Sequence, residues 1–166
     1  MIHLKKVDIA KEAFIYQASK EADYKECYET QLIKGNISMK KCLIAFFYNP
    51  KWVALLYKLR KILVRPFGLI TDDNPTKINI DVQKGDKCSF FEVLERNETE
   101  IVLFGTDKHL EAWCAIQYDL YPDQHYVLRC STLVKYHNRL GKVYFFLIRP
   151  FHYFVIRDLL NRICKN

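Results

Sequence analysis

Two side chains of this sequence are candidates for acid–base or charge-stabilising chemistry, His152 and Arg60. His152 lies in a largely apolar C-terminal stretch beside Pro150, where an imidazole can donate to a ligand carbonyl or act as a base near neutral pH. Arg60 borders the apolar side of a predicted helix, and a buried guanidinium requires an anionic or carbonyl partner. Together the two residues fit a cyclase or dehydratase, with His152 as base and Arg60 as stabiliser of an enolate.

Both residues also have a structural interpretation, which we favour. A proline inside a helix frees a backbone carbonyl, here that of Phe146, and His152 would then be a core histidine satisfied by such a carbonyl. Arg60 would form an internal ion pair, for which the sequence offers four carboxylates, those of Glu92, Glu95, Glu111 and Asp158.

His109 has acidic neighbours in Asp107 and Glu111, which allows an acid–base pair. Strand alternation, however, puts His109 on the face opposite to Leu110 and Cys114. If the latter face a cavity, His109 points outward, and we expect no catalytic role for it.

The six cysteines are widely scattered, and no two of them form a C-x-x-C pair. A zinc site needs closely spaced ligands, so we expect reduced thiols that pack in the core. Cys114 and Cys130 have no accompanying Cys–His–acid order that would make a nucleophile. Glycine-rich phosphate-binding motifs are also absent, and we expect neither metal nor cofactor.

Length and composition indicate one folded domain over residues 1–166, with 50% hydrophobic and 14% aromatic residues. The net charge is +7, from 26 basic and 19 acidic residues, but the basic residues are spread along the chain. No polybasic run of the kind that binds nucleic acid occurs, so nucleic acid is not an expected partner. The oligomeric state is left open.

Neither a membrane span nor a signal peptide is evident in the sequence. The longest apolar runs, Leu43–Tyr48 and Val143–Ile148, are far shorter than the roughly 20 residues that a spanning helix needs. The first six residues lack the apolar region of a secretion signal. We therefore predict a cytoplasmic protein.

Hydrophobic periodicity predicts an α+β order of elements. A first strand is followed by two helices, then by a run of antiparallel strands, and the last 25 residues form a long helix that opens after Gly141 and is kinked or divided at Pro150. The N-terminal segment before Ala22 stays unassigned. The strands are expected at 22–29, 78–82, 87–96, 100–104, 109–119 and 125–136, and the two inserted helices at 37–48 and 51–65.

The helix predicted over 51–65 is amphipathic, with a basic stripe of Lys51, Lys58, Lys61 and Arg65. Such a stripe could bind a membrane surface or a partner protein. The solvated outer face of a packed helix has the same pattern, and we favour that interpretation. Membrane-surface contact is therefore not expected.

Several short motifs, in this order and spacing, resemble the bacterial family called domain of unknown function 2867. The resemblance extends from about Asp23 to Ile163, and its motifs are Asn49–Val53, Leu59–Arg60, Phe67–Leu69, Gly105–Leu110, Asn138–Tyr144 and Arg149–His152. That family is similar to the START-like, polyketide-cyclase-like (SRPBCC) superfamily. The resemblance implies a helix-grip fold, in which a curved sheet wraps around the C-terminal helix, and an internal cavity for an apolar ligand. It implies no particular reaction, and Ala112 before Trp113 departs from the family pattern, so the shape of the pocket does not transfer.

From alternation and helical spacing we predict which residues form the pocket wall. Thr132 would be the one polar strand residue that faces inward, with Arg60 and His152 near the mouth. We expect a small hydrophobic or amphipathic molecule as the partner, with the cyclase or dehydratase as the alternative use of the same cavity. The predicted wall is formed by Cys114, Ile116, Cys130, Thr132, Val134, Phe151, Val155 and Leu159.

Overall fold

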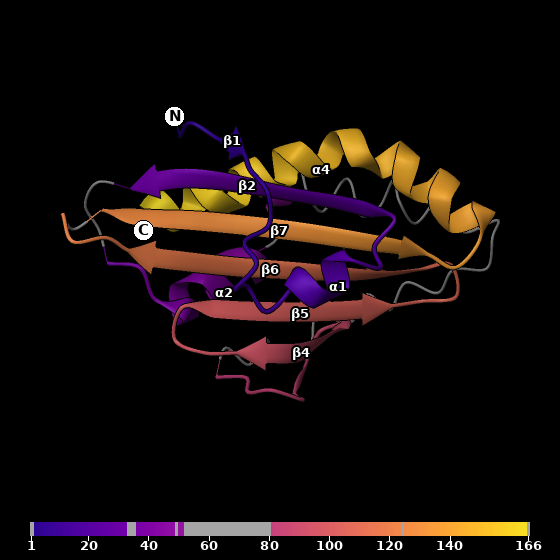
Figure 1. Cartoon of the computed structure of the whole chain (residues 1–166), viewed down its shortest axis with the longest axis horizontal. Helices are drawn as coiled ribbons and strands as arrows, with labels where there is room; N and C mark the ends of the chain where they lie inside the picture. The colour runs from indigo at the N-terminus through magenta and orange to yellow at the C-terminus, as the bar shows by residue number, and fades with distance from the viewer. Residues whose placement is uncertain (1, 33–35, 49, 52–80, 124, 166) are drawn as a thin grey trace.

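The fold is α+β and consists of one antiparallel sheet with a long C-terminal helix across one of its faces (Figure 1). The computed structural model describes residues 2–32, 36–48, 50–51, 81–123 and 125–165. The predicted α+β class and the helix-grip-like arrangement, a curved sheet against the C-terminal helix, are confirmed. Nearly all of the helix predicted over 51–65, most of the strand predicted over 78–82, and Arg60 lie outside the described residues.

The seven strands are ordered β1-β2-β7-β6-β5-β4-β3, and every neighbouring pair is antiparallel. The strand predicted over 87–96 is divided, because Ser89 adopts a left-handed backbone (φ 59°) between β3 and β4. The strands are β1 (Lys5–Lys6), β2 (Tyr24–Leu32), β3 (Lys87–Cys88), β4 (Phe91–Arg96), β5 (Glu100–Thr106), β6 (Leu110–Leu120) and β7 (Tyr126–Tyr136).

The two longest strands, β6 and β7, pair over their whole length, from Leu110 opposite Tyr136 to Leu120 opposite Tyr126. On its other edge, β7 pairs with β2. This register aligns Glu26, Thr132 and Cys114 in one row across the three strands, on the face that the helix covers. The alternation in β6 and β7 therefore predicted the shared face correctly.

The larger core lies between that face of the sheet and two helices, α2 (Met39–Phe47) and α4 (Arg139–Lys165). Ser38 caps α2, because its hydroxyl accepts a hydrogen bond from the backbone N–H of Lys41 (3.3 Å). The two helices also contact each other, since the Arg162 guanidinium donates to the carbonyl of Ala45 (3.1 Å). The buried residues of this core come from seven strands or helices, and among them are Leu43, Leu103, Ile116, Leu128, Cys130, Ile156 and Leu160.

The opposite face of the sheet is covered too, by the N-terminal segment that the sequence left unassigned. This segment carries the short helix α1 (Tyr16–Ser19), which lies across the sheet in Figure 1. The buried carboxylate of Glu100 fixes it, by accepting a hydrogen bond from the backbone N–H of Phe14 (2.9 Å). Ile15 and Leu133 belong to the second apolar cluster formed there.

The helix α4 is continuous through Pro150, so the predicted division does not occur. It begins two residues before Gly141, where Asn138 caps it: the Asn138 side-chain oxygen accepts from the Gly141 N–H (3.1 Å). Gly141 lies so close to His109 that an added Cβ would stand 2.1 Å from the His109 carbonyl oxygen. No helix among the described residues is both long and apolar enough to span a membrane.

Candidate functional site

One face of β2 presents three alternating side chains toward α4: Tyr24, Glu26 and Tyr28. Successive residues of a strand point to opposite faces, so these three share one face because of their spacing alone. The strand lies one position from the edge of the sheet, with only the two-residue β1 beyond it. This face of β2 is therefore bordered by the core on one side and reaches the protein surface on the other.

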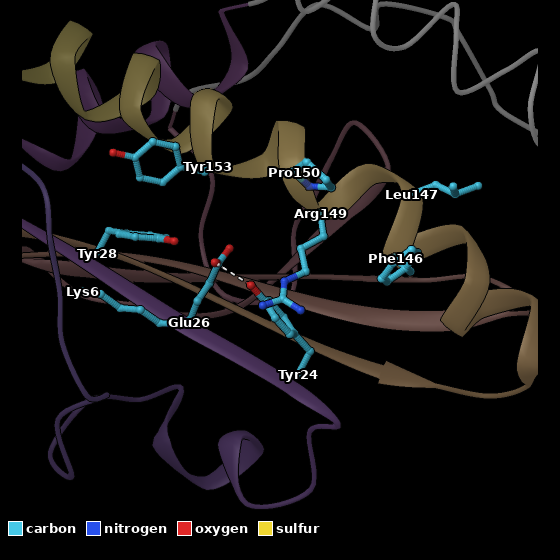
Figure 2. Close-up of a pocket in the computed structure, with 9 residues that line it drawn as sticks. All are labelled: Lys6, Tyr24, Glu26, Tyr28, Phe146, Leu147, Arg149, Pro150 and Tyr153. Carbon is cyan, nitrogen blue, oxygen red and sulfur yellow. Dashed lines mark hydrogen bonds between the residues drawn. The ribbon is translucent and has the colours of Figure 1, made fainter.

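The same turns of α4 that cross β2 complete an open groove of about 440 Å³ (Figure 2). Tyr24, Glu26 and Tyr28 form its floor, and Lys6 of β1 lies at its edge. The opposite wall comes from α4 and consists of Phe146, Leu147, Arg149, Pro150 and Tyr153. We call this hollow the β2–α4 groove.

Glu26 is the buried acid of the groove, with 5% of its surface exposed. One of its carboxylate oxygens lies 2.6 Å from Nδ1 of His152, and the other accepts a hydrogen bond from the Tyr24 hydroxyl (2.7 Å). Burial opposes ionisation of Glu26, but the hydrogen bond and charge of His152 and the bonds from Tyr24 and Tyr28 outweigh it. They lower the pKa of Glu26 below its ordinary value. The groove therefore holds an ionised carboxylate whose two oxygens are both engaged.

The pKa of the Tyr24 hydroxyl is raised, first by burial and then by the neighbouring Glu26 carboxylate. Tyr24 therefore stays a phenol that donates to Glu26, as the dashed line in Figure 2 shows. The guanidinium of Arg149 lies over the Tyr24 ring, 4.9 Å from its centroid, in a cation–π contact. At the other end of the floor, the Tyr28 and Tyr153 rings meet edge to face with centroids 5.4 Å apart.

The two cations of the groove differ from Glu26 in lacking an opposite charge. Among the described residues, neither Lys6 nor Arg149 forms an ion pair. Both are exposed at the groove edge. Among the described residues, the groove thus offers two cations without an ion-pair partner, tyrosine rings and an apolar helix surface to one bound molecule.

Of the two candidate catalytic residues, His152 belongs to this cluster, since its Nδ1 contacts Glu26. The partner of that nitrogen is a carboxylate rather than the backbone carbonyl that the structural interpretation assumed. The sequence did not indicate Glu26 as this partner, because the two residues are 126 positions apart and only the fold brings them together. An available signal was the alternation Tyr-Lys-Glu-Cys-Tyr over 24–28, which puts a carboxylate between two tyrosines on one strand face.

The strand residues predicted as pocket wall lie under α4, on the same face as Glu26. Leu159 is buried there as well, Val155 is partly buried, and Phe151 is 45% exposed and points away from the sheet. The groove is lined by other residues than these eight, so the internal cavity that they were predicted to enclose stays a prediction. The buried strand members are Ile116, Cys130, Thr132 and Val134, and Cys114 is partly buried.

Cys27, Cys42, Cys114, Cys130 and Cys164 are free thiols, as predicted. Burial raises the pKa of Cys114 to about 12, and that of Cys130 lies well above its ordinary value for the same reason. Protonated thiols are poor nucleophiles, which agrees with packing as their role. Among the described residues, no three His, Cys, Asp or Glu side chains come together in a way that could hold a metal ion.

His109 has a structural position at the start of α4. Its Nδ1 lies 3.1 Å from the side-chain oxygen of Asn138, the residue that caps the helix. The Asn138 amide in turn donates to the carbonyl of Lys108 (3.1 Å). The motif around 105–110 and the motif around 138–144 are therefore in direct contact, and they fix the helix to the turn between β5 and β6.

Comparison with known proteins gives one family. No curated protein and no solved structure matches the chain. A family described as "Protein of unknown function (DUF2867)" matches residues 18–159, which include β2, the groove wall on α4, Glu26 and His152. Because the match covers most of its length, the chain belongs to the DUF2867 family.

Proposed function

We propose that this protein binds a small hydrophobic or amphipathic molecule in the β2–α4 groove. The observation that carries the proposal is the groove itself: about 440 Å³, open to solvent, with tyrosines on its floor and an apolar helix wall. Binding sites for small molecules have volumes of roughly 300–1,000 Å³ and combine apolar walls with a few polar groups. The groove has this size and this composition.

The polar groups favour an amphipathic molecule with an acidic head. Glu26 already has His152 and Tyr24 as partners, and it would repel a second anion at the floor. Lys6 and Arg149 at the edge are the groups that could bind a carboxylate or phosphate, Arg149 through two parallel hydrogen bonds. Phe146, Leu147 and Pro150 would cover the apolar part of the molecule.

The resemblance to the START-like superfamily supports the same conclusion. Its helix-grip fold implies an apolar ligand, and the order of strands and the position of α4 agree with that fold. Binding of a small molecule in the cytoplasm, without metal or nucleotide, remains our proposal.

Extraction of the purified protein into organic solvent, followed by mass spectrometry, tests whether a ligand co-purifies. A parallel titration with an apolar fluorescent probe that carries a sulfonate tests the free groove. We expect a saturable, stoichiometric site, and competition between the probe and medium-chain fatty acids. Absence of both a co-purified ligand and a saturable site would refute the proposal.

A second candidate function is an enzyme of the cyclase or dehydratase type in the same groove. The contact between Glu26 and His152 favours it, because a carboxylate on one ring nitrogen holds an imidazole in a fixed orientation. His152 would remove a proton from carbon next to a ligand carbonyl. Incubation of an extracted ligand with wild type and with His152→Asn distinguishes the candidates: turnover by wild type alone supports the enzyme, and unchanged ligand in both supports binding only.

A further inference from the structure

The side of α4 that faces away from the sheet carries an unusual density of exposed apolar side chains. Half of the exposed large hydrophobic residues among the described positions belong to this helix. Phe146 is 71% exposed, Val143 57% and Phe154 53%. The others on the helix are Leu140, Leu147 and Phe151.

Five of these six side chains form one stripe along the helix. At about 100° per residue, Leu140, Val143, Leu147, Phe151 and Phe154 fall within a narrow sector, which we call the apolar stripe. The buried residues Phe145, Ile156 and Ile163 fall on the opposite side of the helix. Among the described residues, neither apolar cluster includes the apolar stripe, so packing between these residues does not explain it.

The charges beside the stripe are of one sign. Residues 139–157 contain four Arg or Lys residues and no Asp or Glu. Helical spacing puts Arg139 and Arg157 directly beside the apolar stripe. Lys142 and Arg149 lie further round the helix on the same side, toward the β2–α4 groove that Arg149 lines. Arg139, Lys142 and Arg149 are exposed.

We propose that this face of α4 docks on an anionic lipid bilayer. A helix with an apolar face and a Lys- and Arg-rich flank lies in the plane of a membrane interface, with its apolar side chains among the acyl chains and its cations at the headgroups. The net charge of +7 adds attraction to such a surface. A protein partner would require an acidic surface with a matching apolar channel, whereas an anionic bilayer supplies both features without a specific shape.

This surface differs from the predicted basic helix over 51–65, for which we expected no membrane contact. Because the apolar stripe of α4 is exposed, we now expect membrane contact, and we expect it at α4 rather than at residues 51–65. Phe146 and Leu147 belong both to the outer side of α4 and to the groove wall. In this respect the inference rests on the proposed function, because a docked protein would have its groove mouth at the headgroups, where an amphipathic acid enters or leaves a bilayer.

Co-sedimentation with vesicles tests the docking. One set contains phosphatidylcholine alone, and the other contains phosphatidylglycerol as well. We expect binding to the anionic vesicles that weakens with added salt, and a loss of at least about tenfold in the double variant Val143→Gln/Phe154→Gln. The matched control is Phe90→Gln/Leu120→Gln, which removes two equally exposed apolar side chains elsewhere and should bind as wild type does.

Three results would overturn the docking proposal. The first is no binding of the protein to anionic vesicles. The second is equal binding by wild type and by Val143→Gln/Phe154→Gln. The third is that wild type forms a dimer in solution, that this double variant is a monomer, and that neither of the two proteins binds vesicles. If Lys58→Glu/Lys61→Glu loses vesicle binding while Val143→Gln/Phe154→Gln binds as wild type does, the second result has been obtained and the docking proposal is overturned. Since neither Val143 nor Phe154 lines the groove, the probe titration should be unchanged in their double variant, so failure of the docking and failure of ligand binding are separable.

Discussion

Nδ1 of His152 lies 2.6 Å from a carboxylate oxygen of Glu26, and this contact joins α4 to β2 across 126 positions of the chain. Glu26 is almost completely buried, while His152 retains 23% of its side-chain surface. The pair therefore stands at the boundary between the core and the β2–α4 groove. It fixes the floor of the groove to its wall.

Glu26→Gln should destabilise the protein by about 2 kcal/mol at neutral pH, because a buried charge-assisted contact is lost and its partners stay in place. The matched control is Asp123→Asn, which removes the carboxylate that contacts His125 on the surface. Exposed pairs contribute between zero and about 1 kcal/mol, so the control should unfold almost as wild type does. Urea denaturation measures both, and equal losses in the two variants would contradict the role given to Glu26.

The pKa of Glu26 is lower in the folded protein than its ordinary value of 4.5. A carboxyl group with a depressed pKa stabilises the fold above its unfolded pKa, and this contribution is lost as the pH falls through the folded pKa. The stability difference between wild type and Glu26→Gln should therefore shrink as the pH falls below 4.5. Melting temperatures over a pH series measure it, and a difference that grows in acid would contradict the assigned direction.

Gly141→Ala should displace the start of α4, because the new methyl group would stand 2.1 Å from the His109 carbonyl oxygen. We expect a loss of about 3 kcal/mol or more in the free energy of unfolding, at the upper end of overpacking effects. Gly105→Ala is the control: its methyl group would approach the Phe91 ring to 3.3 Å, and a side chain can shift, while the Phe90 carbonyl oxygen at 3.6 Å is at ordinary contact distance. If the two variants are equally stable, the close approach of α4 to the turn at His109 is not what fixes the helix.

Cys130→Trp tests the internal cavity that the sequence predicted. Cys130 is 2% exposed and packs in the larger core cluster with Ile116 and Leu128. We expect the added volume to cost roughly 1–3 kcal/mol or more, with probe binding in the groove retained. An unchanged melting temperature together with reduced probe capacity would instead show a cavity under α4 and restore the predicted pocket wall.

The strands β5, β6 and β7 and the helix α4 were predictable because each has a strong local period. A strand needs only alternation, and α4 carries an apolar repeat. Its start was predicted after Gly141, whereas the helix begins at Arg139, after the cap Asn138. The pairing of Glu26 with His152 was not predictable in the same way, because the register of β2 against β7 and the position of α4 over β2 decide it, and neither is local. The structure of the N-terminal segment could not be predicted for a different reason. Its position depends on Glu100, a residue of a distant strand, whose carboxylate accepts the hydrogen bond from the Phe14 N–H.

The outer face of α4 shows a further limit of the sequence. Val143–Ile148 is apolar all round, a pattern typical of a helix that is covered on most sides. Phe145 is buried as expected, but Phe146 and Val143 are exposed. Hydrophobicity alone does not distinguish a buried surface from one that is left for a partner.

The central claim is that the β2–α4 groove binds an amphipathic molecule, and a matched pair of tryptophan variants tests it most directly. Leu147 lines the groove and is 48% exposed, whereas Leu140, on the same helix and 41% exposed, does not line it. Titration with the anionic apolar probe should show saturable binding by wild type and Leu140→Trp, and binding at least about tenfold weaker by Leu147→Trp. Equal binding by all three proteins, or saturable binding by none, would contradict the account.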